Sequence, residues 1–89
     1  MYTVTYHSKV AEDIKGLSAA AKRQIKTAIE DKLMSEPTLF GKPLQFSLKG
    51  LRSLRVGNYR VVFSLSENEV YIVLIAHRSV VYKNVVKRL

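Results

Sequence analysis

The sequence predicts a small α+β domain, in which a mostly antiparallel sheet carries a helical hairpin on one face. Three observations predict this class: an alternating N-terminal segment, two segments with helical spacing, and three strand-like segments in the second half. The expected order is β-α-α-β-β-β. The 89 residues are expected to form a single domain, 1–89, and 47% hydrophobic residues suffice for one core.

The first half of the chain is expected to hold one strand and both helices. Residues 2–6 alternate between aromatic or aliphatic side chains and threonine, which predicts a strand. Ser8 is the expected N-cap of a short helix that ends near Gly16. Ser18 is the expected N-cap of a longer helix, which Pro37 ends.

The second half is expected to hold the remaining strands. Residues 37–50 contain both prolines and two of the four glycines, and predict a loop. Strands are expected at about 51–56, 59–65 and 70–77, with Gly57-Asn58 as a tight turn between the first two. The tail, SVVYKNVVKRL, is ambiguous, because its apolar spacing is helical but β-branched residues disfavour a helix.

The charge of the chain points to a polyanionic or acidic partner. Fifteen basic and seven acidic residues give a net charge of +8, and the second half carries most of the uncompensated positive charge. The chain has no cysteine, so thiolate chemistry and disulfides are excluded. No apolar run approaches the roughly 18–20 residues of a membrane span, and the N-terminus has no signal-peptide pattern. We therefore expect a soluble, cytoplasmic protein.

The turn at Gly57-Asn58 determines which side chains share a face of the sheet. It places Val56 opposite Tyr59 and Arg55 opposite Arg60. Like charges directly opposite each other destabilise a sheet. The arginine pair becomes favourable if an anion binds between the two guanidinium groups, which bind phosphate in a bidentate manner.

Strand alternation predicts which residues join the arginine pair. If Glu67-Asn68 is a two-residue turn, His77 lies on the same open face, with Arg78 and Tyr82 at its rim. The last strand is then expected to place Tyr71, Val73 and Ile75 on the arginine side, and Val70, Ile72, Leu74 and Ala76 on the apolar side. The candidate catalytic residues are Arg55, Arg60, His77, Arg78 and Tyr82.

This set of residues suits RNA cleavage without a metal. A ribose 2′-OH attacks the adjacent phosphorus, arginines stabilise the charge of the transition state, and an acid protonates the leaving oxygen. His77 is the candidate proton carrier, because an unperturbed histidine has a pKa near ~6.5. Tyr82 can stack on a base or orient the 2′-OH. No acidic residue lies near the cluster in sequence, so we expect no metal and no cofactor.

Each of these residues also has a plainer explanation. Exposed arginines on a strand are commonly solvated surface, and a lone histidine at a strand end is commonly structural. Tyr82 can simply cover the edge of the core. Three basic residues of the second predicted helix form a solvated face that can also touch a long polyanion: Lys22, Arg23 and Lys26.

Two motifs give the chain a resemblance to a known family. The segment GKPLQFSLKGLRSLRVGNYRVVFSL contains G-K-P-L and K-G-x-x-S-x-R-x-G-x-Y-R-V-V-F, and VYIVLIAHRSVVY contains H-R-x-x-x-Y. With these motifs the chain resembles the RelE/ParE superfamily of type II toxins over nearly its whole length. The resemblance implies the β-α-α-β-β-β order predicted above.

The resemblance to RelE-type members also implies a function. It implies a metal-independent endoribonuclease that cuts mRNA in the ribosomal A site and inhibits translation. Arg55 and Arg60 correspond to strand arginines around the scissile phosphate, Tyr82 to the functional tyrosine and Arg78 to the basic residue before it. The implied partners are mRNA, the ribosome with its 16S rRNA, and an antitoxin in a hetero-oligomer. We expect RNA contacts from Lys22, Arg23, Lys26, Lys49, Arg52 and Lys83.

The chain departs from the RelE-type pattern at two places. A lysine pair is replaced by the stretch Leu51-Arg52-Ser53, and a basic residue expected before His77 is Ala76. The general base is therefore open: His77 is the substitute candidate, and Lys49 or Arg52 can assist. The alternative function is that of a ParE-type toxin, which binds and inhibits DNA gyrase without RNase activity. A third is a toxin remnant that only binds its antitoxin or RNA.

Overall fold

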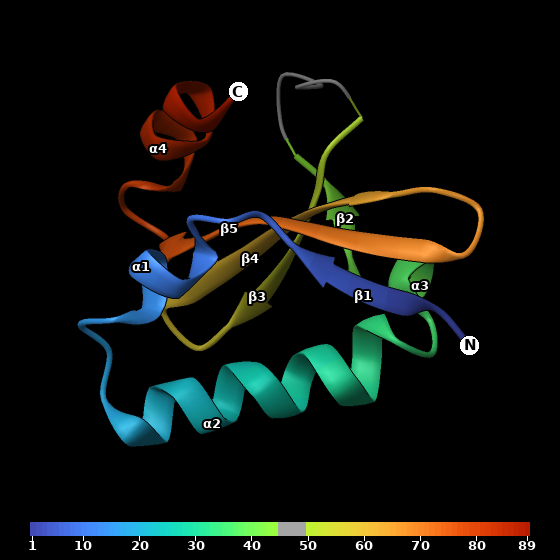
Figure 1. The fold of residues 1–89 in the computed structure, drawn as a ribbon, viewed down its shortest axis with the longest axis horizontal. Helices are drawn as coiled ribbons and strands as arrows, with labels where there is room; N and C mark the ends of the chain where they lie inside the picture. The colour runs from blue at the N-terminus through green and yellow to red at the C-terminus, as the bar shows by residue number, and fades with distance from the viewer. Residues whose placement is uncertain (45–49) are drawn as a thin grey trace.

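The computed structural model describes residues 1–44 and 50–89, and these residues form a five-stranded open sheet (Figure 1). The strand order is β1-β5-β4-β3-β2, with β1 parallel to β5 and each other pair antiparallel. This arrangement confirms the predicted α+β class. The strands are β1 (Thr3–Tyr6), β2 (Lys42–Pro43), β3 (Arg52–Val56), β4 (Tyr59–Leu65) and β5 (Glu69–His77).

Helices lie on both faces of the sheet. In Figure 1, α2 runs along one face, and α4 lies over the other. The C-terminal tail is thus helical, which settles the ambiguity of its sequence. None of the helices in the described ranges is long and apolar enough to cross a membrane. The helices are α1 (Val10–Ile14), α2 (Ala19–Ala28), the π-helix η1 (Ile29–Leu33), α3 (Pro37–Phe40) and α4 (Val81–Arg88).

One of the two predicted helix caps is confirmed. The Ser18 hydroxyl accepts a hydrogen bond from the Ala21 N–H at 3.1 Å, as an N-cap does. The prediction for Ser8 is wrong, because Lys9 is the N-cap of α1 and its side chain makes no capping bond. Instead, Nδ1 of His7 accepts from the Lys9 N–H at 3.0 Å. The imidazole of His7 thus binds the backbone of the N-cap residue, and no side chain caps the first turn of α1.

The segment after α2 differs from the prediction. The helix passes into one π turn that buries Ile29 and Leu33 and ends at Met34, before Pro37. Pro37 begins α3 instead, where its fixed φ and missing N–H suit the first turn. The predicted loop at 37–50 therefore contains a turn of helix and the short strand β2.

The sheet separates two hydrophobic clusters. The cluster on the α2 side is the larger, and we call it the helix-side cluster. The cluster under α4 is the α4-side cluster. The helix-side cluster includes Val10, Ile25, Ile29, Leu33, Leu54, Val56, Val61, Phe63, Val70, Ile72 and Ile75. The α4-side cluster includes Leu44, Leu51, Val62, Val73, Leu74, Ala76, Val81 and Val85.

A β-bulge in β5 changes which residues share a face. Leu65 pairs with Val70, so the two-residue turn before β5 is as predicted. The register then shifts, because Phe63 pairs with Ile72 and Val62 with Leu74. Val73 is left without an opposite residue, as in a bulge. Beyond this point every side chain lies on the face opposite to the one predicted.

The membership of the two hydrophobic clusters shows that the residues after the bulge change face. Leu74 and Ala76, expected on the apolar face toward α2, belong to the α4-side cluster. Ile75, expected on the arginine side, belongs to the helix-side cluster. His77 pairs with Tyr59 and lies with it on the helix side, so its predicted place beside the arginines is wrong. Simple alternation failed because one extra residue inverts the parity of the strand.

Candidate nucleic-acid interface

The β3–β4 hairpin presents the arginine pair as predicted. Arg55 pairs directly with Arg60, and Val56 pairs with Tyr59. The turn needs Gly57, whose φ of 59° lies in the left-handed region that glycine adopts without strain. Both arginines lie on the α4 side of the sheet, above Val62 and its neighbours. We call this surface, made by Ser53, Arg55 and Arg60, the arginine face.

The two guanidinium groups are held differently. Arg60 is half-buried, and its Nη1 donates to Oγ of Ser53 at 3.0 Å. Arg55 is exposed, and its Nε donates to the carbonyl oxygen of Gly57 at 3.4 Å. Ser53 is 3% exposed, and sequence reasoning gave it no role although it shares the face of Arg55. Its place diagonal to Arg60 on the neighbouring strand was the available signal.

Neither arginine is neutralised within the part of the chain that the structure describes. The ion pair found there joins Asp13 and Arg88, not the arginine face. Two like charges on opposite strands repel each other, and a bound anion would relieve that repulsion. The arginine face therefore has the charge and geometry that suit an anion.

Two further predicted site residues lie at the border of the arginine face. The backbone N–H of Arg78 donates to the carbonyl oxygen of Asn58 at 2.8 Å, which places Arg78 beside the hairpin turn. Tyr82, in the first turn of α4, packs against the α4-side cluster, on the same side of the sheet as Arg60. Lys83 follows it and is exposed. Tyr82 thus lies on the same side of the sheet as Arg55 and Arg60, and the backbone of Arg78 lies beside their hairpin turn.

His77 does not join them. Its ring makes an edge contact with Tyr59, with 5.7 Å between the centroids, on the helix side of the sheet. Nδ1 of His77 accepts from the Ser79 N–H at 3.1 Å and lies 2.8 Å from Oγ of Ser79. An accepting Nδ1 places the proton of a neutral ring on Nε2. This arrangement does not suit a general base for a reaction on the opposite face.

The predicted RNA-contacting residues do not form one continuous surface. Arg52 lies away from the arginine face, where its Nη2 donates to the carbonyl oxygens of Gly41 at 3.1 Å and Thr38 at 3.4 Å. It therefore holds the C-terminal end of α3. Its Nε is buried without a partner among the described residues. Lys49 lies outside the described residues.

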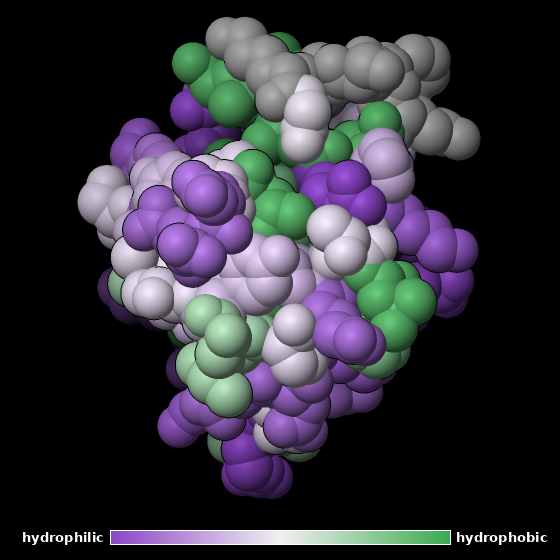
Figure 2. Space-filling model, turned by 90° about the vertical axis from the view of Figure 1, so that its right-hand side faces the viewer, coloured by the Kyte–Doolittle hydropathy of each residue, from purple (hydrophilic) through white to green (hydrophobic). Residues whose placement is uncertain are grey.

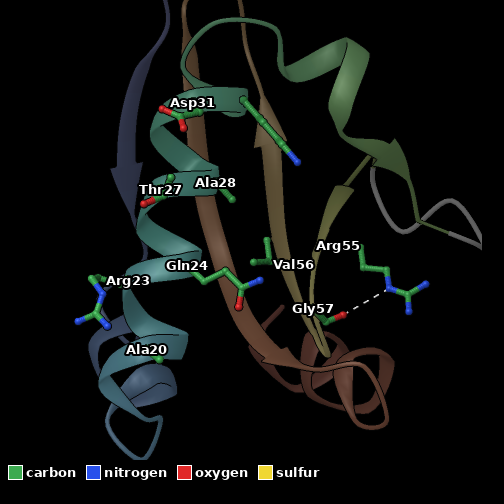
Figure 3. A pocket seen from close by; sticks show the side chains of 10 residues that line it. Ala20, Arg23, Gln24, Thr27, Ala28, Asp31, Arg55, Val56 and Gly57 are labelled. Carbon is green, nitrogen blue, oxygen red and sulfur yellow. Dashed lines mark hydrogen bonds between the residues drawn. The ribbon is translucent and has the colours of Figure 1, made fainter.

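The basic residues of α2 line two different grooves. Arg23 and Arg55 line a groove of about 650 Å³ between α2 and β3 (Figure 3). In that view Gln24 points toward the strand, whereas the two guanidinium groups point away from each other. Arg23 and Arg55 therefore do not form a joint anion site.

Lys22 and Lys26 line the second groove, of about 470 Å³, with Tyr6 and Glu30. Burial, and to a lesser degree the charge of Glu30, raises the pKa of Tyr6. This groove lies on the helix side, so these two lysines are separated from the arginine face by the sheet.

The remaining surface adds little to this picture. Figure 2 shows the end of the molecule near the N-terminus, where hydrophobic groups lie between hydrophilic ones and no apolar patch crosses the face. Within residues 1–44 and 50–89, no group of three or more histidine or acidic side chains lies together as a metal site would. On the arginine face, Arg55 and Arg60 have no carboxylate partner among the described residues.

The fold and this surface define a small α+β protein with a net charge of +8 and a pair of opposed arginines that no described carboxylate neutralises. Residues 4–82 match the family model described as the ParE toxin of the type II toxin–antitoxin system parDE. Over 84 residues the chain is 33% identical to Toxin RelE of Mycobacterium tuberculosis, covering 92% of this chain and 87% of that protein. The chain therefore belongs to the RelE/ParE superfamily of type II toxins.

Solved structures agree with this assignment. The toxin–antitoxin complex RelBE2 of M. tuberculosis is similar with a TM-score of 0.78 and 29% identity, over 86% of this chain and 98% of that chain. The RelB–RelE antitoxin–toxin complex of Methanococcus jannaschii has a TM-score of 0.71 at 20% identity, over 90% and 96%. The isolated RelE toxin of E. coli has a TM-score of 0.68 at 21% identity, over 99% and 98%. The last two comparisons show the fold alone.

Proposed function

We propose that this protein is a ribosome-dependent endoribonuclease that cuts mRNA in the A site. The observation that carries the proposal is the opposed pair Arg55 and Arg60, which no described carboxylate neutralises. Membership of a toxin superfamily that includes RelE supports the same assignment. Ribosomes are cytoplasmic, so the proposal also places the protein in the cytoplasm.

The arginine face provides the electrostatic part of the reaction. The 2′-oxygen forms a bond to phosphorus, the bond to the 5′-oxygen breaks, and the two products carry a cyclic phosphate and a 5′-hydroxyl. Negative charge grows on the phosphoryl oxygens in the transition state. Arg60, fixed by Ser53, and Arg55 stabilise that charge from opposite sides. Tyr82 orients the nucleotide from α4, and Arg78 binds the neighbouring backbone.

Among the described residues of this face, no side chain is a good acceptor for the proton of the 2′-OH. The described residues there are arginine, serine and tyrosine, which in general do not accept a proton near neutral pH. His77 lies on the opposite face. We therefore assign the removal of the proton to solvent, and the rate enhancement to positioning and charge stabilisation without a metal.

An antitoxin protein is the proposed second partner. The similar structures from M. tuberculosis and M. jannaschii are complexes of a toxin with its antitoxin. A net charge of +8 favours an acidic segment that covers the arginine face in a hetero-oligomer. Such a segment neutralises the arginine pair and blocks access of RNA.

Primer extension on a defined mRNA, with and without translating ribosomes, tests the nuclease. We expect cuts only with ribosomes, and a loss of about 10²–10³-fold in rate for Arg60→Ala, the usual effect of removing one transition-state donor. Lys15→Ala is the matched control, because Lys15 is exposed at the end of α1 and its substitution also removes one positive charge. Cuts on naked RNA, or full activity of the Arg60 variant, would contradict the proposal.

A gyrase-binding function is the second candidate. The matching family model is that of a ParE toxin, and the placement of His77 removes the one predicted proton carrier from the arginine face. A gyrase inhibitor needs no such group. If expression arrests growth while mRNA stays intact, inhibition of DNA supercoiling by the purified protein would favour this candidate.

A further inference from the structure

The edge of β5 loses its strand partner halfway along. β1 pairs with β5 from Thr3 to Tyr6, and the last ladder bond runs from the His7 N–H to the Ile72 carbonyl at 2.8 Å. The chain then turns into α1. From Val73 onward, which is also the position of the bulge, no described strand pairs with this edge of β5. Buried backbone groups at such an edge need other partners.

Asp13 and Arg88 supply those partners. Oδ2 of Asp13 accepts from the Ile75 N–H at 3.1 Å, and Nη1 of Arg88 donates to the Val73 carbonyl at 2.9 Å. The two side chains also bind each other, through Nη2 to Oδ1 at 2.7 Å and Nη1 to Oδ2 at 3.0 Å. Their side chains are only 9% and 13% exposed. We call this arrangement the Asp13–Arg88 clasp.

The clasp joins two helices that lie on opposite sides of the sheet. Asp13 belongs to α1, and Arg88 is the last residue of α4. The hydrogen bonds that Arg88 donates to the Asp13 carboxylate raise the pKa of Arg88, so the guanidinium stays charged. Arg88 donates to the carbonyl oxygen of Val73, which is the bulge residue. The C-terminal end of α4 is therefore fixed to the position in β5 where the register shifts.

Helix α4 depends on such anchors. It has eight residues, fewer than the roughly 12–15 that an isolated helix needs to be stable in water. Val81 and Val85 are 1% and 0% exposed, and Arg88 continues their i, i+4, i+7 stripe toward the sheet. The same helix carries Tyr82 in its first turn. An ordered Tyr82 therefore requires a docked α4.

We infer that the Asp13–Arg88 clasp is a positioning device, which holds α4 against the β5 bulge and thereby holds Tyr82 at the arginine face. The part of this inference that concerns cleavage rests on the proposed nuclease function. Asp13 and Arg88 touch no RNA in this role and act through Tyr82. The docking of α4 can be measured without any activity.

Hydrogen–deuterium exchange of the purified protein tests the docking. In Arg88→Met, we expect the amides of α4 to exchange at least tenfold faster, while those of the β3–β4 hairpin stay unchanged. Lys87→Met is the matched control, because Lys87 is the exposed neighbour of Arg88 on α4 and its substitution also removes one positive charge. It should change exchange in α4 by less than twofold.

A second variant separates the clasp from simple charge attraction. Arg88→Lys keeps the charge, but its three N–H donors lie on a single nitrogen and cannot reproduce the planar fork that spans both Asp13 oxygens and the Val73 carbonyl. We expect it to loosen α4 as well, and it also serves as the test if Arg88→Met does not fold. Wild-type exchange in α4 of Arg88→Lys would overturn the clasp.

Ribosome-dependent cleavage tests the link to Tyr82. Arg88→Lys should lower kcat by tenfold or more with little change in KM. In a Tyr82→Ala background, which removes both the ring and the hydroxyl, the same substitution should lower kcat by less than twofold, because a residue that acts through Tyr82 loses its effect there. Equal losses in both backgrounds would overturn the positioning role. A wild-type protein that does not cleave would instead refute the proposed function, and the exchange experiment would still decide the clasp.

Discussion

Arg60 donates a hydrogen bond from Nη1 to Oγ of Ser53 across the β3–β4 hairpin, at 3.0 Å. Ser53 is buried, so its hydroxyl is a fixed acceptor beneath a half-buried guanidinium. The directly opposed Arg55 binds the Gly57 carbonyl and has no comparable side-chain partner among the described residues. One arginine of the pair is thus preorganised, and the other remains free to adjust to a ligand.

Ser53→Ala is expected to lower ribosome-dependent cleavage by about three- to tenfold, because Arg60 loses its fixed direction. The change in the free energy of unfolding should be small, about 0.5–1.5 kcal/mol, since water can replace the hydroxyl as a partner of Arg60. Single-turnover cleavage and urea denaturation measure the two effects. Ser64→Ala on β4 is the control and should leave the rate unchanged. A Ser53 variant with wild-type cleavage would show that Arg60 needs no such support.

Phosphate and sulfate are expected to raise the melting temperature of the free protein. An anion that binds the folded state between Arg55 and Arg60 stabilises it by linkage, by about 2.7 kcal/mol at a hundredfold excess over the Kd. Thermal unfolding at constant ionic strength, with chloride as the reference salt, measures the shift. The double variant Arg55→Ala, Arg60→Ala should lose most of it, whereas Lys15→Ala should keep it. An equal shift in all three proteins would mean that the anion binds elsewhere.

His77→Gln is expected to retain cleavage within about threefold, in contrast to Arg60→Ala. The ring lies against Tyr59 on the helix side, and its Nδ1 is occupied by Ser79. If no histidine removes the 2′-OH proton, the logarithm of the rate should rise through pH 6–8 without a bend near ~6.5. Single-turnover rates across this range measure the profile. A bend that disappears in the glutamine variant would restore His77 as the general base.

Gly41→Ala is expected to destabilise the fold by about 1–3 kcal/mol, the usual cost of overpacking. A Cβ at this position would overlap the ring of Phe63 and lie 2.9 Å from the Pro37 carbonyl oxygen. Phe63 is completely buried, so its ring has no room to move. Gly16→Ala is the matched control, because a Cβ there meets nothing within 4 Å. Chemical denaturation of both variants should show a loss only for the first.

The β3–β4 hairpin could be predicted in detail because its signals are local. Gly57-Asn58 fixes a two-residue turn, the turn fixes the register, and the register places Arg55 opposite Arg60. The α2 cap at Ser18 is local in the same sense, and the structure confirms it. At the start of α1 the prediction was wrong, because the helix begins one residue later than expected, with Lys9 as its N-cap, and the imidazole of His7 binds the Lys9 N–H.

The face of His77 was not predictable from alternation. The segment VYIVLIA is apolar at nearly every position, because β5 is covered by α1 and α2 on one side and by α4 on the other. In a strand that is buried on both faces, apolar and polar residues do not alternate. An inserted residue therefore does not change the hydrophobic pattern of its sequence. The bulge at Val73 therefore moved Leu74, Ala76 and His77 to unexpected faces without any sequence signal.

The sequence by itself determined the order of the elements, the arginine hairpin and the excess of positive charge, since each depends on nearby residues or on composition. Only the tertiary structure decided which face of the sheet each functional side chain occupies and how α4 is held. Asp13 and Arg88 are separated by 75 positions. Their contact arises because β1 ends early and leaves Val73 and Ile75 with backbone groups to satisfy, a requirement that no local pattern encodes.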